Sequence, residues 1–297
     1  MLNVAVIGAG IVGKATGKGF IKAGHAVTFV DSDGATLELL GEKGYTVAEI
    51  NLLTRIEYEV SIICLPTPLK NEKVDLRAFK NALPYVGRKL SSCNDYHLVV
   101  IRSTVLPGTT ENFIIPQLEQ FSGKTAGKDF GICMNPEFLR QKTSQTDFLK
   151  PWSIVIGALD KKSGDTLLEL YRYFIEKEKP AVTVTNLRTA EMIKYAQNLY
   201  NAVKISFTNE IWKISQEINV DGNEVMADVV QSAEGMWNPN YGTRGGYPYS
   251  GHCLPKDTRC FLTYAKNELK MDMPLLEATI NVNESIKAMN ENAGKLP

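Results

Sequence analysis

The chain has 297 residues, of which 44% are hydrophobic, and its 33 Lys and Arg balance its 33 Asp and Glu. This length allows one large domain or two ordinary ones, and the composition is typical of a soluble globular protein. The charge balance excludes a global field that would recruit nucleic acid or an anionic membrane surface, and no apolar run is long enough to span a bilayer.

Apolar, β-rich runs alternate with helical stretches through the first half of the chain, which predicts a Rossmann-like, doubly wound, mostly parallel α/β sheet. Several of these runs are continuously apolar, as in strands buried on both faces. Strands are expected at residues 3–7, 26–30, 60–64, 98–102, 130–134, 153–156 and 182–184, and helices at 11–23, 76–90, 110–120 and 162–175. We assign residues 1–186 to this Rossmann-like α/β domain.

The second part, residues 187–297, is predicted to be all-helical. Residues 189–216 contain no Gly or Pro, and apolar side chains recur at helical spacing, so one long helix is expected. Such a helix is longer than a typical globular helix, and it is expected to connect two domains or to form the seam of a homodimer, or to serve both purposes. Further helices are expected at 223–231, from about 255, and at 275–290, after a loop rich in Gly, Tyr and Pro at 237–250.

The cysteines and histidines are scattered. Five cysteines with no paired spacing predict no disulfide framework, and three isolated histidines predict no metal site. A reducing cytoplasm is the natural compartment for such a chain. The first residues, Met1–Gly8, predict a strand rather than a signal peptide.

A glycine motif, Gly8-Ala9-Gly10-Ile11-Val12-Gly13, directly follows the first strand and opens a helix. The first Gly allows a tight turn, the second lets the backbone approach a pyrophosphate, and the third permits close packing of helix on strand. Asp31 ends the second strand, where a carboxylate accepts ribose hydroxyls and repels a 2′-phosphate. The motif in this context predicts an NAD site.

Two more segments end strands at the same predicted sheet edge. Cys64-Leu65-Pro66-Thr67-Pro68 follows the third strand, and Arg102-Ser103-Thr104 with Pro107-Gly108 follows the fourth. Ligands of open α/β sheets bind beyond the carboxyl ends of strands, so Thr67, Pro68, Ser103 and Thr104 are expected beside the cofactor. Taken alone, each segment is better explained as a proline-fixed turn, but both lie at the same sheet edge as the glycine loop.

Cys253, in Gly251-His252-Cys253-Leu254-Pro255-Lys256-Asp257, is a candidate nucleophile. Pro255 is a good first helical residue, so Cys253 is expected near the positive end of a helix, with Lys256 adding charge. These conditions favour a reactive thiolate that traps an aldehyde. These seven residues alone favour a buried structural thiol, and it is the rest of the chain that favours a nucleophile.

The chain resembles the UDP-glucose/GDP-mannose dehydrogenase family, most closely its UDP-glucose 6-dehydrogenases. The matching segments occur in family order along nearly the whole chain: Gly8–Gly13, Pro66–Pro68, Ser103-Thr104 with Pro107-Gly108, Asn135–Arg140, Ala190–Asn198 and Gly251–Asp257. The resemblance implies oxidation of a UDP-glucose-like 6-hydroxyl to the uronic acid, with two NAD reduced in turn.

The resemblance implies a role for each residue of this chain that matches a functional residue of the family. Cys253 corresponds to the nucleophile, Glu137 to the acid that orients or activates water, and Lys194 with Asn198 to the pair that stabilises oxyanions. Asp257 corresponds to the carboxylate beside the nucleophile, Thr104 to a substrate- and water-positioning hydroxyl, and Lys256 to a cofactor contact. The resemblance further implies cofactor contacts at Gln141 and substrate contacts at Glu137, Phe138, Leu139, Arg140, Lys194, Asn198, Tyr241, Tyr247, Tyr249 and Gly251.

The chain departs from the family pattern at several positions. Gln141 stands where a second acid is common, and Pro248 and Ser250 stand where the family's substrate loop has glycines. The sequence also stops where the family's C-terminal nucleotide-binding domain is expected to begin. Two alternatives therefore stay open: a two-electron dehydrogenase of the β-hydroxyacid type, which needs no cysteine, and a non-catalytic NAD-binding module.

Overall fold

The computed structural model describes residues 1–292, and the chain forms two compact units that divide after Gln197. The division lies within the long helix α7 (Leu187–Glu217), whereas the sequence placed it at residue 186. The first turns of α7 belong to the first unit because Leu187 and Ala190 are buried in its core.

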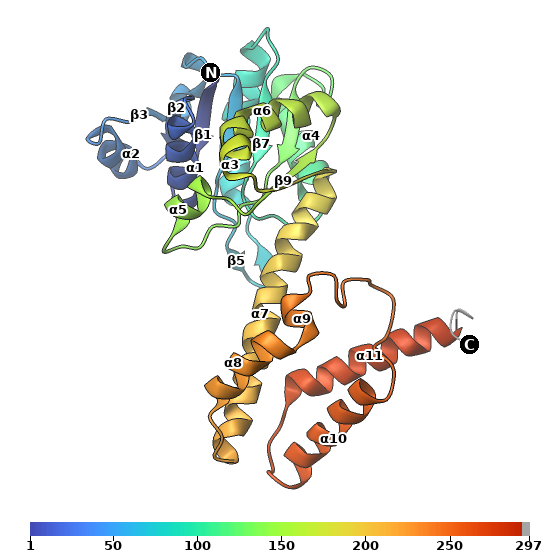
Figure 1. The fold of residues 1–297 in the computed structure, drawn as a ribbon. Helices are drawn as coiled ribbons and strands as arrows, with labels where there is room; N and C mark the ends of the chain where they lie inside the picture. Colours follow the sequence, from blue (N-terminus) through green and yellow to red (C-terminus); the bar gives the residue numbers. More distant parts are fainter. Residues whose placement is uncertain (293–297) are drawn as a thin grey trace. The chain divides into compact units, whose positions relative to one another are not determined.

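An eight-stranded sheet in the order β10-β9-β8-β7-β4-β1-β2-β3 organises the first unit (Figure 1). Strand β9 pairs antiparallel with β8 and parallel with β10, and the other neighbours pair parallel. The predicted mostly parallel, Rossmann-like sheet is therefore confirmed. The strands are β1 (Asn3–Ile7), β2 (Ala26–Asp31), β3 (Thr46–Glu49), β4 (Val60–Ile63), β7 (Leu98–Ile101), β8 (Gly131–Met134), β9 (Ser153–Ala158) and β10 (Ala181–Thr185).

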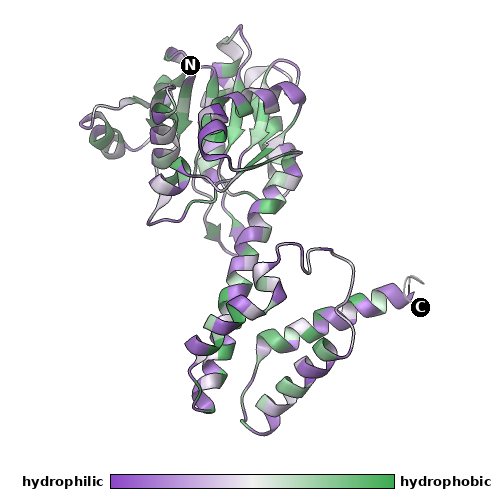
Figure 2. Cartoon of the chain, in the orientation of Figure 1, coloured by the Kyte–Doolittle hydropathy of each residue, from purple (hydrophilic) through white to green (hydrophobic). Residues whose placement is uncertain are grey.

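Helices cover both faces of the sheet and complete two apolar cores. One face is covered by α1 (Ile11–Lys22), α5 (Ser144–Leu149) and α6 (Lys161–Glu178). The other is covered by α3 (Arg77–Ser92), α4 (Ile115–Ser122) and the start of α7. The central strands β4, β7 and β8 are buried along their whole length, which explains their continuous hydrophobic runs, whereas the edge strands β3 and β10 are largely exposed (Figure 2).

Several short elements were not predicted. They are α2 (Gly34–Gly41), the 3-10 turn η1 (Ile50–Arg55), the β5–β6 hairpin (Leu69–Lys70 and Lys73–Val74), α5 and the edge strand β3. The helix expected at 110–120 is also divided into a π-helical turn, η2 (Thr110–Ile114), and α4. Pro116 lacks the N–H of a regular helical hydrogen bond at this point, which is consistent with the wider turn before it.

The second unit is helical, as predicted. After α7 it contains α8 (Gly222–Ser232), α9 (Glu234–Trp237), α10 (Cys253–Asn267) and α11 (Pro274–Asn292). Its apolar core is small and centres on Ile214, Ala265 and Met273. The Glu210 carboxylate accepts the N–H of Leu275 at 2.6 Å, which ties α7 to the start of α11. Within residues 1–292, no helix is long and apolar enough to cross a membrane.

Candidate active site

The glycine loop between β1 and α1 has the close contacts that its motif requires. Gly8 has φ +97°, and a Cβ there would lie 2.6 Å from the carbonyl oxygen of Cys64. A Cβ on Gly13 would lie 1.9 Å from the carbonyl oxygen of Gly8, whereas a Cβ on Gly10 would meet nothing within 4 Å. Gly8 and Gly13 therefore allow backbone packing, and Gly10 keeps the surface above the loop bare.

Asp31 fixes the end of β2 to this loop. Its Oδ2 accepts the N–H of Ala9 at 2.7 Å, and its Oδ1 accepts the N–H of Ser32 at 2.7 Å. The neighbouring Asp33 caps α2 by accepting the backbone N–H of Thr36 at 3.3 Å. It also accepts the hydroxyl of Thr36 at 2.6 Å, and that hydrogen bond is the main cause that holds the pKa of Asp33 below its usual range. Two carboxylates at this end of the site oppose a 2′-phosphate.

One long cleft follows the carboxyl ends of β1, β2, β4 and β7. Of the predicted residues, those lining it are Gly8, Gly10, Ile11, Val12, Asp31, Thr67, Ser103, Thr104 and Glu137. Gly13 packs behind the loop, and Pro68 and Gln141 do not line the cleft. The hydroxyl of Thr67 donates to the carbonyl of Thr104 at 2.6 Å, which joins the two loops beyond β4 and β7.

Sequence reasoning missed one wall of this cleft. Helix α3 contributes Lys80, Asn81, Pro84, Tyr85 and Arg88. These residues recur at three- and four-residue spacing and therefore share one helix face. That spacing was the available signal, since the helix after the third strand of a doubly wound sheet lies beside the ligand crevice.

The cleft fits NAD. The N-terminus of α1 has no side-chain cap, so its first N–H groups are available to a pyrophosphate, and Gly10 leaves the space above them open. Asp31 is held where it can accept the hydroxyls of the adenosine ribose. Within the described part of the chain, no group of three His, Cys, Asp or Glu side chains could hold a metal ion.

Glu137 and Lys194 form an ion pair at the opposite end of the cleft from Asp31. The Lys194 Nζ lies 3.0 Å from Oε1 of Glu137, and their side chains are 7% and 14% exposed. The second oxygen of Glu137 accepts the N–H of Leu139 at 2.6 Å. The ammonium also lies 5.5 Å from the ring centre of Phe138. The structure thus brings together a carboxylate after β8 and an amine from α7.

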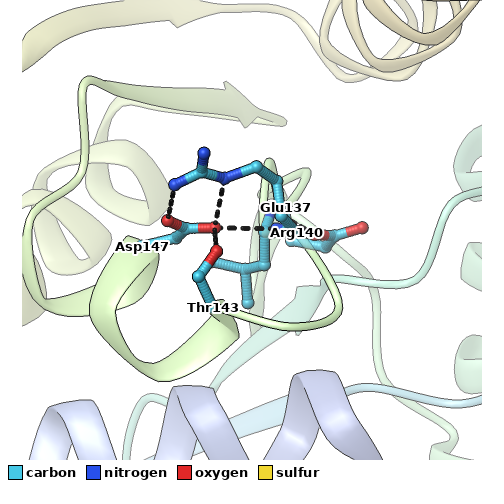
Figure 3. A network of polar contacts seen from close by, with 5 residues as sticks. Glu137, Arg140, Thr143 and Asp147 are labelled. Carbon is cyan, nitrogen blue, oxygen red and sulfur yellow. Dashed lines mark hydrogen bonds and ion pairs between the residues drawn. The ribbon is translucent and has the colours of Figure 1, made fainter.

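The segment after Glu137 is folded around Asp147 (Figure 3). The Arg140 side chain donates to Asp147 at 2.7 Å, its backbone N–H does so at 2.9 Å, and Thr143 donates its hydroxyl at 2.9 Å. These bonds hold the pKa of Asp147 well below its usual range, with the Arg140 side chain as the main cause. The side chain of Arg140, for which a substrate contact was predicted, is therefore bonded to helix α5 through Asp147.

Glu191 is a further buried carboxylate that sequence reasoning missed. It is 0% exposed and accepts the N–H groups of Gly108 at 2.5 Å and of Thr110 at 2.8 Å. Glu191 thereby attaches α7 to the loop that begins with Ser103 and Thr104. An exposed ion pair, Arg188–Glu111, joins the same two elements.

Within the second unit, Cys253 is exposed at the first position of α10. The expectation of a cysteine at a helix N-terminus is confirmed, although Pro255 is the third helical residue rather than the first. Lys256 and Asp257 follow and pair at 2.8 Å, both largely exposed. Asn198 lies on α7 one turn after Lys194.

The loop before α10 contains the three tyrosines that were predicted to contact substrate. Tyr241 and Tyr247 are exposed, and Arg244 lies over the ring of Tyr247 at 4.4 Å. Tyr249 is anchored, since its backbone N–H donates to Asn283 at 2.7 Å.

Comparison with known proteins gives matches along most of the chain. Residues 54–175 match the NAD binding domain of the UDP-glucose/GDP-mannose dehydrogenase family, and residues 188–285 match its central domain. The GDP-mannose 6-dehydrogenase of Pseudomonas syringae pv. tomato is 37% identical over 305 residues, covering 96% of this chain and 68% of the relative. The UDP-glucose 6-dehydrogenase of Haloferax volcanii is 34% identical over 303 residues, covering 95% of this chain and 70% of the relative.

The fold is also similar to a solved structure, a ternary complex of GDP-mannose dehydrogenase from Pseudomonas aeruginosa. It superposes with a TM-score of 0.89 at 33% identity and covers 98% of this chain and 71% of the other. The chain therefore belongs to the UDP-glucose/GDP-mannose dehydrogenase family of NAD-dependent enzymes.

Proposed function

We propose that this protein oxidises the 6-hydroxyl of a nucleotide sugar to a carboxylate. The observation that carries the proposal is the buried Lys194–Glu137 pair beside a cleft that fits NAD. A fixed ammonium stabilises a developing alkoxide, and a neighbouring carboxylate is suited to proton transfer. Glu137 lines this cleft together with Thr104, whose hydroxyl we assign to positioning the substrate and water.

The cofactor would be held by the glycine loop and Asp31, with Thr67, Pro68, Ser103, Thr104, Gln141 and Lys256 as further proposed contacts. Bound NAD supplies the hydride acceptor for each oxidation. Lys194 and Asn198, spaced i, i+4 on α7, would stabilise the oxyanion formed when the sugar hydroxyl loses its proton. Loss of a hydride and that proton converts the alcohol to an aldehyde.

Cys253 would carry the second half of the reaction. Its thiolate would attack the aldehyde carbon to form a thiohemiacetal, and loss of a second hydride and a proton would leave a thioester. Glu137 would activate water to hydrolyse the thioester, which releases the acid and regenerates the thiolate. Asp257 would act beside the nucleophile. Exposure of Cys253 at the start of α10 supports this role over that of a structural thiol.

We propose GDP-mannose as the first substrate to test and UDP-glucose as the second. Relatives named GDP-mannose 6-dehydrogenase are 36–37% identical, whereas two named UDP-glucose 6-dehydrogenase are 34% and 30% identical. We assign sugar contacts to the segment Glu137–Arg140 and to the loop that contains Tyr241, Tyr247, Tyr249 and Gly251.

The test is a panel of nucleotide sugars incubated with NAD. We expect two NADH and one uronic acid per sugar consumed, and Cys253→Ala should abolish acid formation. One NADH per turnover with an aldehyde or ketone product would instead indicate the β-hydroxyacid type of dehydrogenase. Normal NAD binding without turnover of any sugar would indicate a non-catalytic module, and unimpaired acid formation by Cys253→Ala would contradict the thioester route.

We also propose a homodimer that forms through α7. Apolar side chains are exposed along this helix at roughly four-residue spacing, among them Leu199, Val203 and Phe207. The second unit buries little apolar surface of its own, so covering this stripe would stabilise it. Sedimentation of the purified protein should show a dimer, and Val203→Glu should shift it toward the monomer. A wild-type protein that sediments only as a monomer at micromolar concentration would contradict the proposal.

A further inference from the structure

Arg102, the residue directly after β7, is buried among neutral groups. Only 5% of it is exposed. Its Nε donates to the hydroxyl of Thr16 at 2.8 Å, and its Nη1 donates to Oδ1 of Asn135 at 2.6 Å and to the hydroxyl of Tyr171 at 2.9 Å. The guanidinium also lies 5.2 Å from the ring centre of Phe148. These groups satisfy hydrogen-bond donors but supply no opposite charge.

The ionisable groups around Arg102 leave its charge uncompensated. Burial raises the pKa of Cys64 to about 12 and also raises the pKa of Tyr171, so both stay neutral at physiological pH. The two nearby carboxylates have their own cations: Glu137 pairs with Lys194, and Asp147 pairs with Arg140. Three cations against two anions leave one excess positive charge, and an arginine cannot release it by deprotonation.

This charge lies at one particular end of the cofactor cleft. Arg102 lines the cleft together with Ser103, Thr104 and Glu137. Asp31, at the other end of the cleft, is where the adenosine ribose is expected to bind. The glycine loop, which lies between Asp31 and Arg102, is where the pyrophosphate is expected to bind. A dinucleotide laid across the loop therefore places its nicotinamide on the Arg102 side.

We infer that Arg102 biases the site toward the reduced cofactor. The nicotinamide ring carries a positive charge in NAD⁺ and is neutral in NADH, so a buried cation near it opposes only the oxidised form. Tighter binding of NADH than of NAD⁺ makes the bound cofactor a stronger hydride acceptor. This effect acts through the field of Arg102, at low local dielectric and without contact with the ring. It depends on NAD binding and not on the proposed sugar chemistry.

The experiment compares the dissociation constants of NAD⁺ and NADH for the wild type, Arg102→Gln and Arg102→Lys by calorimetric titration. The wild type should bind NADH more tightly than NAD⁺. Arg102→Gln should lower the ratio of the NAD⁺ dissociation constant to the NADH dissociation constant on the order of tenfold, the size that Coulomb's law gives for two unit charges within a protein interior. Arg102→Lys keeps the charge and should keep the ratio within about twofold.

If Arg102 had only a structural role, Arg102→Gln would weaken the binding of NAD⁺ and of NADH equally. An unchanged ratio of the NAD⁺ to the NADH dissociation constant in Arg102→Gln would therefore overturn the inference. If Arg102→Gln does not fold, Asn135→Asp provides the same test, because it places a carboxylate at the position that lies 2.6 Å from the guanidinium. It should lower the ratio as Arg102→Gln does. Tyr171→Phe is the matched control, since it removes a hydrogen bond to Arg102 but no charge, and its ratio should stay at the wild-type value.

Discussion

The Nζ of Lys194 lies 3.0 Å from the carboxylate of Glu137, and the two residues come from different elements, α7 and the loop after β8. Neither side chain is more than 14% exposed. Each side chain is therefore the main counter-charge of the other, which would otherwise be buried without an ion-pair partner. The same ion pair therefore has two roles: it belongs to the proposed catalytic site, and it holds the start of α7 against the loop after β8.

Removing one partner should cost more than removing both. Lys194→Met should lower the free energy of unfolding by about 2–4 kcal/mol, because it leaves Glu137 buried and unpaired. The double variant Lys194→Met/Glu137→Gln should recover part of that loss. Urea unfolding of the wild type, both single variants and the double variant gives the coupling energy. A double variant whose loss equals the sum of the single losses would show that the two groups do not interact.

Two glycines of the loop should respond differently to the same substitution. A Cβ on Gly13 would meet the carbonyl oxygen of Gly8 at 1.9 Å, so Gly13→Ala should destabilise the fold by about 3 kcal/mol. A Cβ on Gly10 meets nothing in the protein, so Gly10→Ala should fold with nearly wild-type stability.

The methyl group of Gly10→Ala should instead occupy space next to the pyrophosphate and weaken NAD binding by about tenfold or more. Thermal unfolding without cofactor and NAD titration together separate the two effects. Wild-type NAD affinity in Gly10→Ala would contradict the placement of the pyrophosphate.

Local patterns in the sequence were sufficient for the glycine loop and for Asp31, because the motif specifies its own strand, turn and helix. By contrast, no sequence pattern indicates that the charged side chains of Arg102 and Glu191 are buried. Their partners, Asn135 and the N–H of Gly108, are 33 and 83 residues away in the sequence. Burial of a charged side chain becomes visible only once the strands bring such distant segments together. Likewise, only the packing shows that the first turn of α7 lies in the core of the first unit.

We expect Glu191 to stabilise the loop that contains Thr104. The exposed acid Glu111 is the matched control. Glu191→Gln replaces one of the two accepting oxygens with an NH2 group that cannot accept an N–H, so we expect a loss of about 2 kcal/mol in stability. Glu111→Gln breaks only an exposed ion pair between the same elements and should cost less than about 0.5 kcal/mol.

Hydrogen exchange localises the Glu191 effect. In Glu191→Gln, the amides of Gly108 and Thr110 should exchange at least about tenfold faster than in the wild type, since 1.4 kcal/mol corresponds to a factor of ten in an opening equilibrium. In Glu111→Gln their exchange should stay close to the wild-type rate. Equal exchange in both variants would remove the special role of Glu191.

His97 predicts a specific loss of stability in acid. Its ring is buried, it lies 2.8 Å from the hydroxyl of Ser61, and burial lowers its pKa to about 3, with the charge of Lys89 adding to the shift. Between pH 6.5 and 3 the unfolded chain binds a proton at this residue that the folded chain refuses. Stability contributed by the neutral ring is therefore complete above pH 6.5 and falls as the pH drops, by about 1.4 kcal/mol per unit.

His97→Gln should flatten this slope, because an amide can hydrogen-bond Ser61 without titrating. Urea unfolding between pH 4.5 and 6.5 isolates the effect, since carboxylates with a lowered pKa, such as Asp147, lose their contribution only below about pH 4. His25, whose pKa is lowered chiefly by partial burial, acts in the same direction, so His25→Gln measures the remainder. A wild-type slope that persists in His97→Gln would show that the ring accepts its proton without unfolding.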